Sequence, residues 1–204
     1  MTLADLERLA ADKPEALRDL SDALVFGEGP NDAALLIVGE APGEEEDLSG
    51  RPFVGRAGQL LDRILASVEL DRADVYITNL VKFRPPGNRN PRPDEIEAAA
   101  PILLEQIRLI RPRIVATLGN VPTQWFLDTK DGITRLHGTW HDWNGIRLMP
   151  LYHPAYLLRN PSREVGSPKW ETWQDVKLLK AVLAELGPKQ GPLVIDTAAA
   201  TPLF

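Results

Sequence analysis

The 204-residue sequence contains no cysteine. This absence excludes disulfides, thiolate metal sites and iron–sulfur clusters held by the chain's own side chains. A long hydrophobic run is also missing, so no segment is expected to span a membrane. The first twenty residues are acidic and helix-like and do not resemble a signal peptide, so we expect a cytoplasmic protein.

An excess of positive charge is missing as well. The 23 Lys and Arg residues against 29 Asp and Glu residues give a net charge of −6, which argues weakly against a nucleic-acid partner. Two segments are nevertheless basic. Residues 82–92 carry four basic side chains and no acidic one, and residues 159–169 carry three basic side chains and one acidic one, Glu164. Local basic patches set the attraction to a phosphate backbone, although solvated loops are the commoner explanation for such clusters.

What is present is an alternation of apolar and amphipathic segments. We expect strands over residues 34–38, 75–79, 114–118 and 146–152, with a weaker strand before the Asn144-Gly145 turn. We expect helices over residues 56–68, 93–110, 123–127 and 169–186, after a helical N-terminal stretch. This order predicts an α/β fold of three α/β/α layers with a central, mostly parallel four-stranded sheet.

The length predicts one domain over residues 1–187, in which residues 1–33 are a helical or loop lead-in to the first strand. Residues 188–204 combine Gly-Pro pairs with a run of small residues, which is typical of a flexible tail.

The most informative segment is residues 35–61. An apolar run ends at Gly39 and is followed by Glu40, a Pro-Gly turn, four consecutive acids and a second glycine-rich turn around Phe53. Ligands of open α/β sheets bind where such loops leave the carboxyl ends of strands. The loop therefore marks the expected site.

Polar side chains stand at the ends of three expected strands: Glu40, Asn79 and His153. Because the carboxyl ends of parallel strands share one edge of a sheet, we expect these side chains to lie close together. Taken singly, Asn79 fits a capping residue and His153 a structural histidine. His137 and His141 are four residues apart, but their surroundings read as turn and strand, so we expect no metal site.

Three motifs that follow one another along the chain indicate a family. GEAPGEEEDLSGRPFVGRAGQLLDRIL, VYITNLVKFRPPGNRNPRPDE and LYHPAYLLR resemble the motifs of family 4 uracil-DNA glycosylases, and the likeness covers about residues 34–186. The family carries four cysteines that hold a [4Fe–4S] cluster; this chain has Phe83 at one of these positions and Ala99 near another. We therefore expect no cofactor and apolar packing in place of the cluster.

The resemblance implies excision of uracil flipped out of single- or double-stranded DNA, leaving an abasic site. It implies that Phe53 stacks on the base, Asn79 reads its edge, and His153 donates to uracil O2 as negative charge develops. Glu40 would hold the attacking water, with Glu46 as second choice. Further base contacts are expected from the backbone N–H groups of Ala41–Gly43.

DNA contacts are expected from side chains beside these motifs. Leu157 would fill the space left by the flipped base, with Leu158 as the alternative. Four cations would contact phosphates: Lys82, Arg84, Arg159 and Arg163. The protein is expected to be a monomer, and its Leu-Phe ending faintly resembles sliding-clamp-binding peptides.

Two other functions remain open from the residues alone. One is a Rossmann-like nucleotide-binding hydrolase that uses the acids and His153 around a metal. The other is a relative that binds lesions without catalysis.

Overall fold

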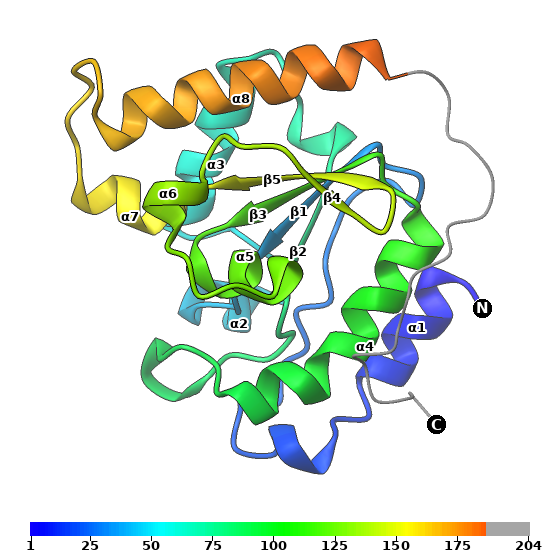
Figure 1. Ribbon diagram of the computed structural model, residues 1–204. Coiled ribbons are helices and arrows are strands. Elements are labelled where there is room, and N and C mark those ends of the chain that lie inside the picture. Colours follow the sequence, from blue (N-terminus) through cyan, green and yellow to red (C-terminus); the bar gives the residue numbers. More distant parts are fainter. Residues whose placement is uncertain (187–204) are drawn as a thin grey trace.

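The computed structural model describes residues 1–186. Its core is a five-stranded sheet in the order β2-β1-β3-β5-β4 (Figure 1). The strands are β1 (Leu35–Gly39), β2 (Tyr76–Asn79), β3 (Ile114–Leu118), β4 (His141–Trp143) and β5 (Ile146–Leu151). All neighbours pair in parallel except β4, which pairs antiparallel with β5.

The predicted α/β class and mostly parallel sheet are confirmed, but the count of four strands is wrong. The fifth strand forms because Asn144 (φ 51°) and Gly145 (φ 78°) both adopt the left-handed conformation of a tight hairpin turn. This turn pairs His141–Trp143 with β5. The short β4 therefore becomes an edge strand.

Helices and short helical turns connect the strands. The helices are α1 (Leu3–Ala10), α2 (Glu44–Ser49), α3 (Arg56–Ala66), α4 (Pro93–Ile110), α5 (Asn120–Leu127), α6 (Ile133–Leu136), α7 (Pro154–Arg159) and α8 (Pro168–Glu185). The 3₁₀ turns are η1 (Glu15–Leu17), η2 (Arg72–Asp74) and η3 (Pro86–Asn88). Helix α4 has the bounds expected from the sequence. Two helices were not expected as separate elements: α2, which lies in the glycine-rich loop, and α7, which begins at Pro154 directly after His153.

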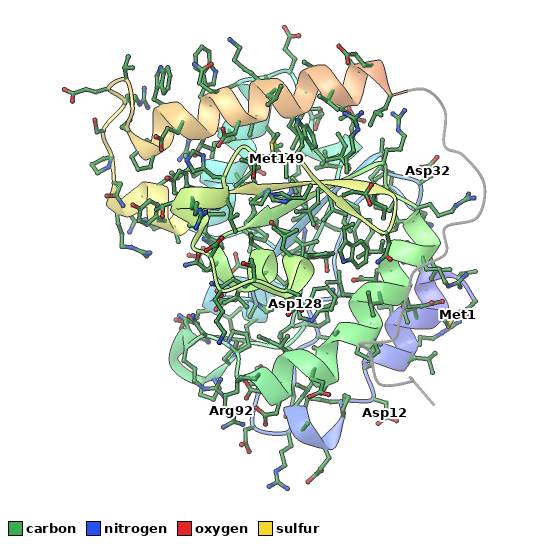
Figure 2. The ribbon with its side chains drawn as sticks, viewed as in Figure 1. Met1, Asp12, Asp32, Arg92, Asp128 and Met149 are labelled. Atoms are coloured by element: carbon green, nitrogen blue, oxygen red, sulfur yellow. The ribbon has the colours of Figure 1, made fainter. Side chains whose placement is uncertain are left out.

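Alternation along β1 divides the core into two halves. Leu36 and Val38 belong to a buried cluster with side chains of α1, α4 and α5, whereas Leu35 and Ile37 belong to one with side chains of α3 and α8. In Figure 1, α4 and α5 lie on one side of the sheet and α3 and α8 on the other. Met149 of β5, labelled in Figure 2, belongs to the second half. A sheet buried on both faces explains why its strands read as continuous apolar runs.

A third apolar cluster ties the lead-in to the rest of the fold. It consists of buried side chains from η1 and the residues after it, from the segment after β2, and from α4: Leu17, Leu20, Val81, Phe83 and Ala99. None of the helices in residues 1–186 is both long and apolar enough to cross a membrane. The expected tail and its clamp-like ending lie outside the described residues.

Candidate active site

A cleft of about 690 Å³ opens at the carboxyl ends of the parallel strands. Glu40 follows β1, Asn79 ends β2 and His153 follows β5, and all three side chains line this cleft. The parallel pairing of β1 with β2 and β3, and of β3 with β5, brings these ends to one edge. Glu40 and His153, which are 113 positions apart in the chain, thus line the same cleft.

Asn79 is 1% exposed, and its side-chain Oδ1 has no hydrogen-bond partner among residues 1–186. A buried acceptor without a partner costs about 1–3 kcal/mol, so such an atom in a cleft points to a missing ligand donor. Gly39 makes the position possible: a Cβ there would lie 2.4 Å from Asn79 Oδ1 and 2.5 Å from Phe53 Cζ. Because Gly39 has no side chain, the Asn79 amide and the Phe53 ring can both pack against its backbone.

His153 is the N-cap of α7, where its Nδ1 accepts a hydrogen bond from Ala155 N at 3.1 Å. Burial, followed by the positive charge of Arg159, lowers the pKa of His153 to about 4. The imidazole is therefore neutral at pH 7. Because Nδ1 accepts, the single ring proton lies on Nε2, which makes Nε2 a hydrogen-bond donor.

The two candidate carboxylates have different surroundings. Glu46 Oε1 accepts from the backbone N–H groups of Val54 and Gly55 at 2.9 Å, and its Oε2 accepts from Gly43 N at 3.1 Å. Glu46 thus holds the two glycine-rich turns together. The carboxylate of Glu40 is half-buried and has no hydrogen-bond partner among residues 1–186; burial raises the pKa of this carboxyl. Glu40 is the carboxylate available to a ligand.

Phe53 is held in an unusual backbone conformation. Its φ is 51°, a region that non-glycine residues seldom occupy. Arg72 donates to the carbonyls of Phe53 (3.1 Å) and Pro52 (2.6 Å), and the backbone of Gly58 packs so closely that a Cβ would lie 1.8 Å from Phe53 O. The ring, 6% exposed, lies with its centroid 5.9 Å from that of His153. This tight support fixes a flat apolar surface in the cleft.

Two backbone donors and one missed residue complete this wall. Ala41 and Gly43 line the cleft, and because the N–H of Gly43 donates to Glu46, its predicted contact with a base would have to compete with this carboxylate. Asn88 also lines the cleft, and its Oδ1 accepts from Arg84 Nε at 2.7 Å. Its adjacent Pro-Pro-Gly turn, with Gly87 at φ 62°, was the sequence signal that could have revealed it.

Two of the predicted DNA contacts are wrong. Leu157 is 1% exposed, in the region where α7 packs on α3, so it is not free to fill a base gap; its neighbour Leu158 is half-buried. Lys82 is 2% exposed, with its ammonium turned into the core, so it cannot reach a phosphate. The packing of α7 on α3 decides the burial of Leu157, and the turn after β2 decides the direction of Lys82. Neither can be read from the neighbouring residues alone.

The other predicted cations remain at the surface. Arg159 is exposed at the cleft, and Arg163 is exposed in the loop between α7 and α8. Arg84 is half-buried, bonded to Asn88 and within 3.5 Å of Glu44 and 3.7 Å of Asp47 in α2. A phosphate contact by Arg84 would have to compete with these acids.

The two histidines outside the cleft have protein partners. His137 Nδ1 lies 2.8 Å from Asp175 Oδ2, and His141 Nε2 lies 2.8 Å from Thr139 Oγ1. Across residues 1–186, no three His, Asp or Glu side chains are grouped so as to hold a metal ion.

An iron–sulfur cluster does not fit the residues present. Such clusters need thiolates, and the chain has no cysteine. Phe83 and Ala99, at or near positions where the resemblance implies cysteines, are 3% and 2% exposed and pack with Leu17 and Leu20 of the lead-in. Apolar contacts hold together the segments that a cluster would otherwise link.

Comparison with known proteins gives a consistent result. The family model of the uracil DNA glycosylase superfamily matches residues 26–177. A type-4 uracil-DNA glycosylase of Thermotoga maritima is 49% identical over 144 residues, which are 70% of this chain and 75% of the relative. Another from Saccharolobus solfataricus is 47% identical over 146 residues, 67% and 68% of the two chains. A type-5 uracil-DNA glycosylase of Pyrobaculum aerophilum is 31% identical over 152 residues, 66% and 67% of the two chains.

Proposed function

Because this chain belongs to the uracil DNA glycosylase superfamily, we propose that it is a DNA repair enzyme that hydrolyses the N-glycosidic bond of uracil. The base would be flipped out of DNA into the cleft, and an abasic site would remain. One observation carries the proposal: an unpaired buried acceptor, Asn79 Oδ1, and a neutral donor, His153 Nε2, line the same cleft beside Phe53.

Base recognition follows from hydrogen-bond chemistry. Asn79 Oδ1 accepts from uracil N3–H, and its side-chain NH₂ group donates to uracil O4. Cytosine presents an amine where uracil has O4, so two donors would face each other and cytosine is rejected. Stacking on Phe53 adds about 1–3 kcal/mol and does not depend on the identity of the base.

Bond cleavage moves an electron pair from the C1′–N1 bond onto the uracil ring. The resulting negative charge is shared with O2, where His153 Nε2–H donates a hydrogen bond. A neutral imidazole suits this role because it donates without having to surrender a proton. The backbone of Gly119 leaves room for this ring: a Cβ there would lie 3.1 Å from His153 Cβ.

Glu40 acts on the sugar side. Its carboxylate holds the attacking water and stabilises the positive charge that develops at C1′. The water oxygen forms the new bond to C1′, and the proton that it loses passes to the carboxylate or to solvent. Glu46 is occupied by three backbone N–H groups and serves to hold the loop.

The DNA strand would lie across α7. Leu158 enters the gap left by the base, and Arg159 and Arg163 contact phosphates. The protein acts as a monomer, since one chain supplies every group that the reaction needs.

A strand-cleavage assay tests the function. Oligonucleotides with a single uracil, cytosine or thymine are incubated with the protein and treated with alkali, which cleaves the strand at abasic sites. We expect cleavage only with uracil, in both single- and double-stranded DNA. Binding to uracil-containing DNA without cleavage would instead support a lesion-binding protein and contradict the proposal.

The acid limb of the pH profile is expected to report Glu40. Because burial raises the pKa of this carboxyl, the ionised form is lost as pH falls through a value above the ordinary 4.5. The single-turnover rate should therefore fall in that range. Glu40→Gln cannot ionise, so its rate should be lower and flat across the same range. An unchanged acid limb in Glu40→Gln would assign the titration to another group.

A further inference from the structure

Lys82 has a buried amino group that the proposed mechanism does not use. Its Nζ lies 2.6 Å from Asn79 O, 2.6 Å from Thr78 Oγ1 and 2.5 Å from Gln106 Oε1. The side chain is 2% exposed, and burial lowers the pKa of its ammonium. The three partners are a carbonyl, a hydroxyl and an amide oxygen, none of them a carboxylate.

The surrounding network fixes the direction of each hydrogen bond. Thr78 Oγ1 donates to Phe26 O at 2.8 Å, so it can only accept from Lys82. Gln106 Nε2 donates to the same carbonyl at 2.9 Å, which leaves Gln106 Oε1 as the acceptor toward Lys82. With Asn79 O, the nitrogen faces three acceptors, which matches the three N–H donors of an ammonium group.

The network ends at the residue that reads the base. Asn79 is the last residue of β2, and its side-chain Oδ1 reaches the cleft without a partner while its main-chain carbonyl is held by Lys82. Lys82 lies three positions later, so its side chain folds back and closes the bend after the strand. Through Gln106 this bend is joined to α4, and through Phe26 to the lead-in.

We propose that Lys82 is a positioning residue that fixes the Asn79 side chain in the geometry that reads uracil. This rests on the proposed function. Burying an amine is costly unless its N–H groups find acceptors, and the three acceptors here tie the carbonyl of Asn79 to Thr78 and Gln106, which fits a role in holding this bend. A shift of about 1 Å in a recognition group can cost on the order of 100-fold in rate.

Lys82→Met tests the inference, because it keeps a similar apolar chain and removes all three donors. We expect the single-turnover excision rate to fall about 10- to 100-fold. Combined with Asn79→Ala, it should cost little more than Asn79→Ala alone, because residues acting through one group are not additive. Lys82→Gln, which keeps an amide donor and needs no buried charge, should give an intermediate rate and serves if Lys82→Met does not fold.

Thr117→Val is the matched control. Thr117 is buried on β3, which β1 separates from β2, and its Oγ1 lies 2.8 Å from Thr123 Oγ1, so the change removes a buried hydrogen bond that is not part of the Lys82 network. Its rate should stay near that of the wild type. Wild-type rates in the folded Lys82 variants, or losses that multiply with that of Asn79→Ala, would overturn the inference. Failure of the wild-type protein to excise uracil would instead overturn the proposed function.

Discussion

His153→Ala is expected to slow uracil excision about 10²- to 10³-fold, the usual cost of losing one donor to a developing oxyanion. The donor is Nε2–H, since Nδ1 accepts from Ala155 N. Binding to uracil-containing DNA should change little, because the hydrogen bond strengthens only as charge develops on the base. Single-turnover rates and binding constants measured on the same oligonucleotide separate the two effects.

The N-cap role of His153 needs its own control. His153→Asn restores a good cap for α7 but places no imidazole donor in the cleft. We expect it to recover the about 1 kcal/mol of stability lost in His153→Ala and none of the rate. Recovery of the rate by Asn would show that the histidine acts only as a cap. The wild-type rate should also show no titration near pH 6.5, because the pKa of His153 is lowered to about 4.

Asn79→Ala is expected to lower the excision rate by about 10²-fold or more, because the site loses both hydrogen bonds to the uracil edge. The same substitution should not lower the stability of the protein. The unpaired Oδ1 costs the free protein about 1–3 kcal/mol, so its removal should leave the free energy of unfolding unchanged or raised. Thermal unfolding and single-turnover excision of the same variant test both expectations.

Asn90→Ala provides the comparison, because Asn90 is an exposed amide that lines the same cleft. It should retain excision within a few-fold of the wild type. A marked loss of stability in Asn79→Ala would show that the amide has a structural partner. An equal loss of activity in both variants would show that the cleft tolerates no change and that the role of Asn79 is not specific.

Much of the fold followed from local patterns. Helix α4 was predicted at Pro93–Ile110 because Pro93 and two acids mark its start and apolar residues recur at helical spacing. Strand β3 was predicted at its observed bounds because five buried residues form one apolar run. Strand β4 was not counted in the sheet, since three residues of mixed polarity carry almost no periodic signal.

Part of the site was also predicted from the sequence. Glu40, Asn79 and His153 were expected to converge because a parallel sheet brings strand ends to one edge, a rule that depends only on topology. The contacts of Glu46 could not be predicted, because its three backbone partners lie in turns that come together only in the folded loop.

The sequence by itself determined the family, the parallel sheet and the loop that bears the site, because motifs and periodicity are properties of neighbouring residues. Only the tertiary structure decided the direction in which each side chain points. Lys82, in a basic segment, turns into the core because Thr78, Asn79 and Gln106 present three acceptors there. Leu157 turns inward and Leu158 stays half-exposed because α7 packs on α3. Burial depends on contacts between distant segments, and a linear pattern does not contain them.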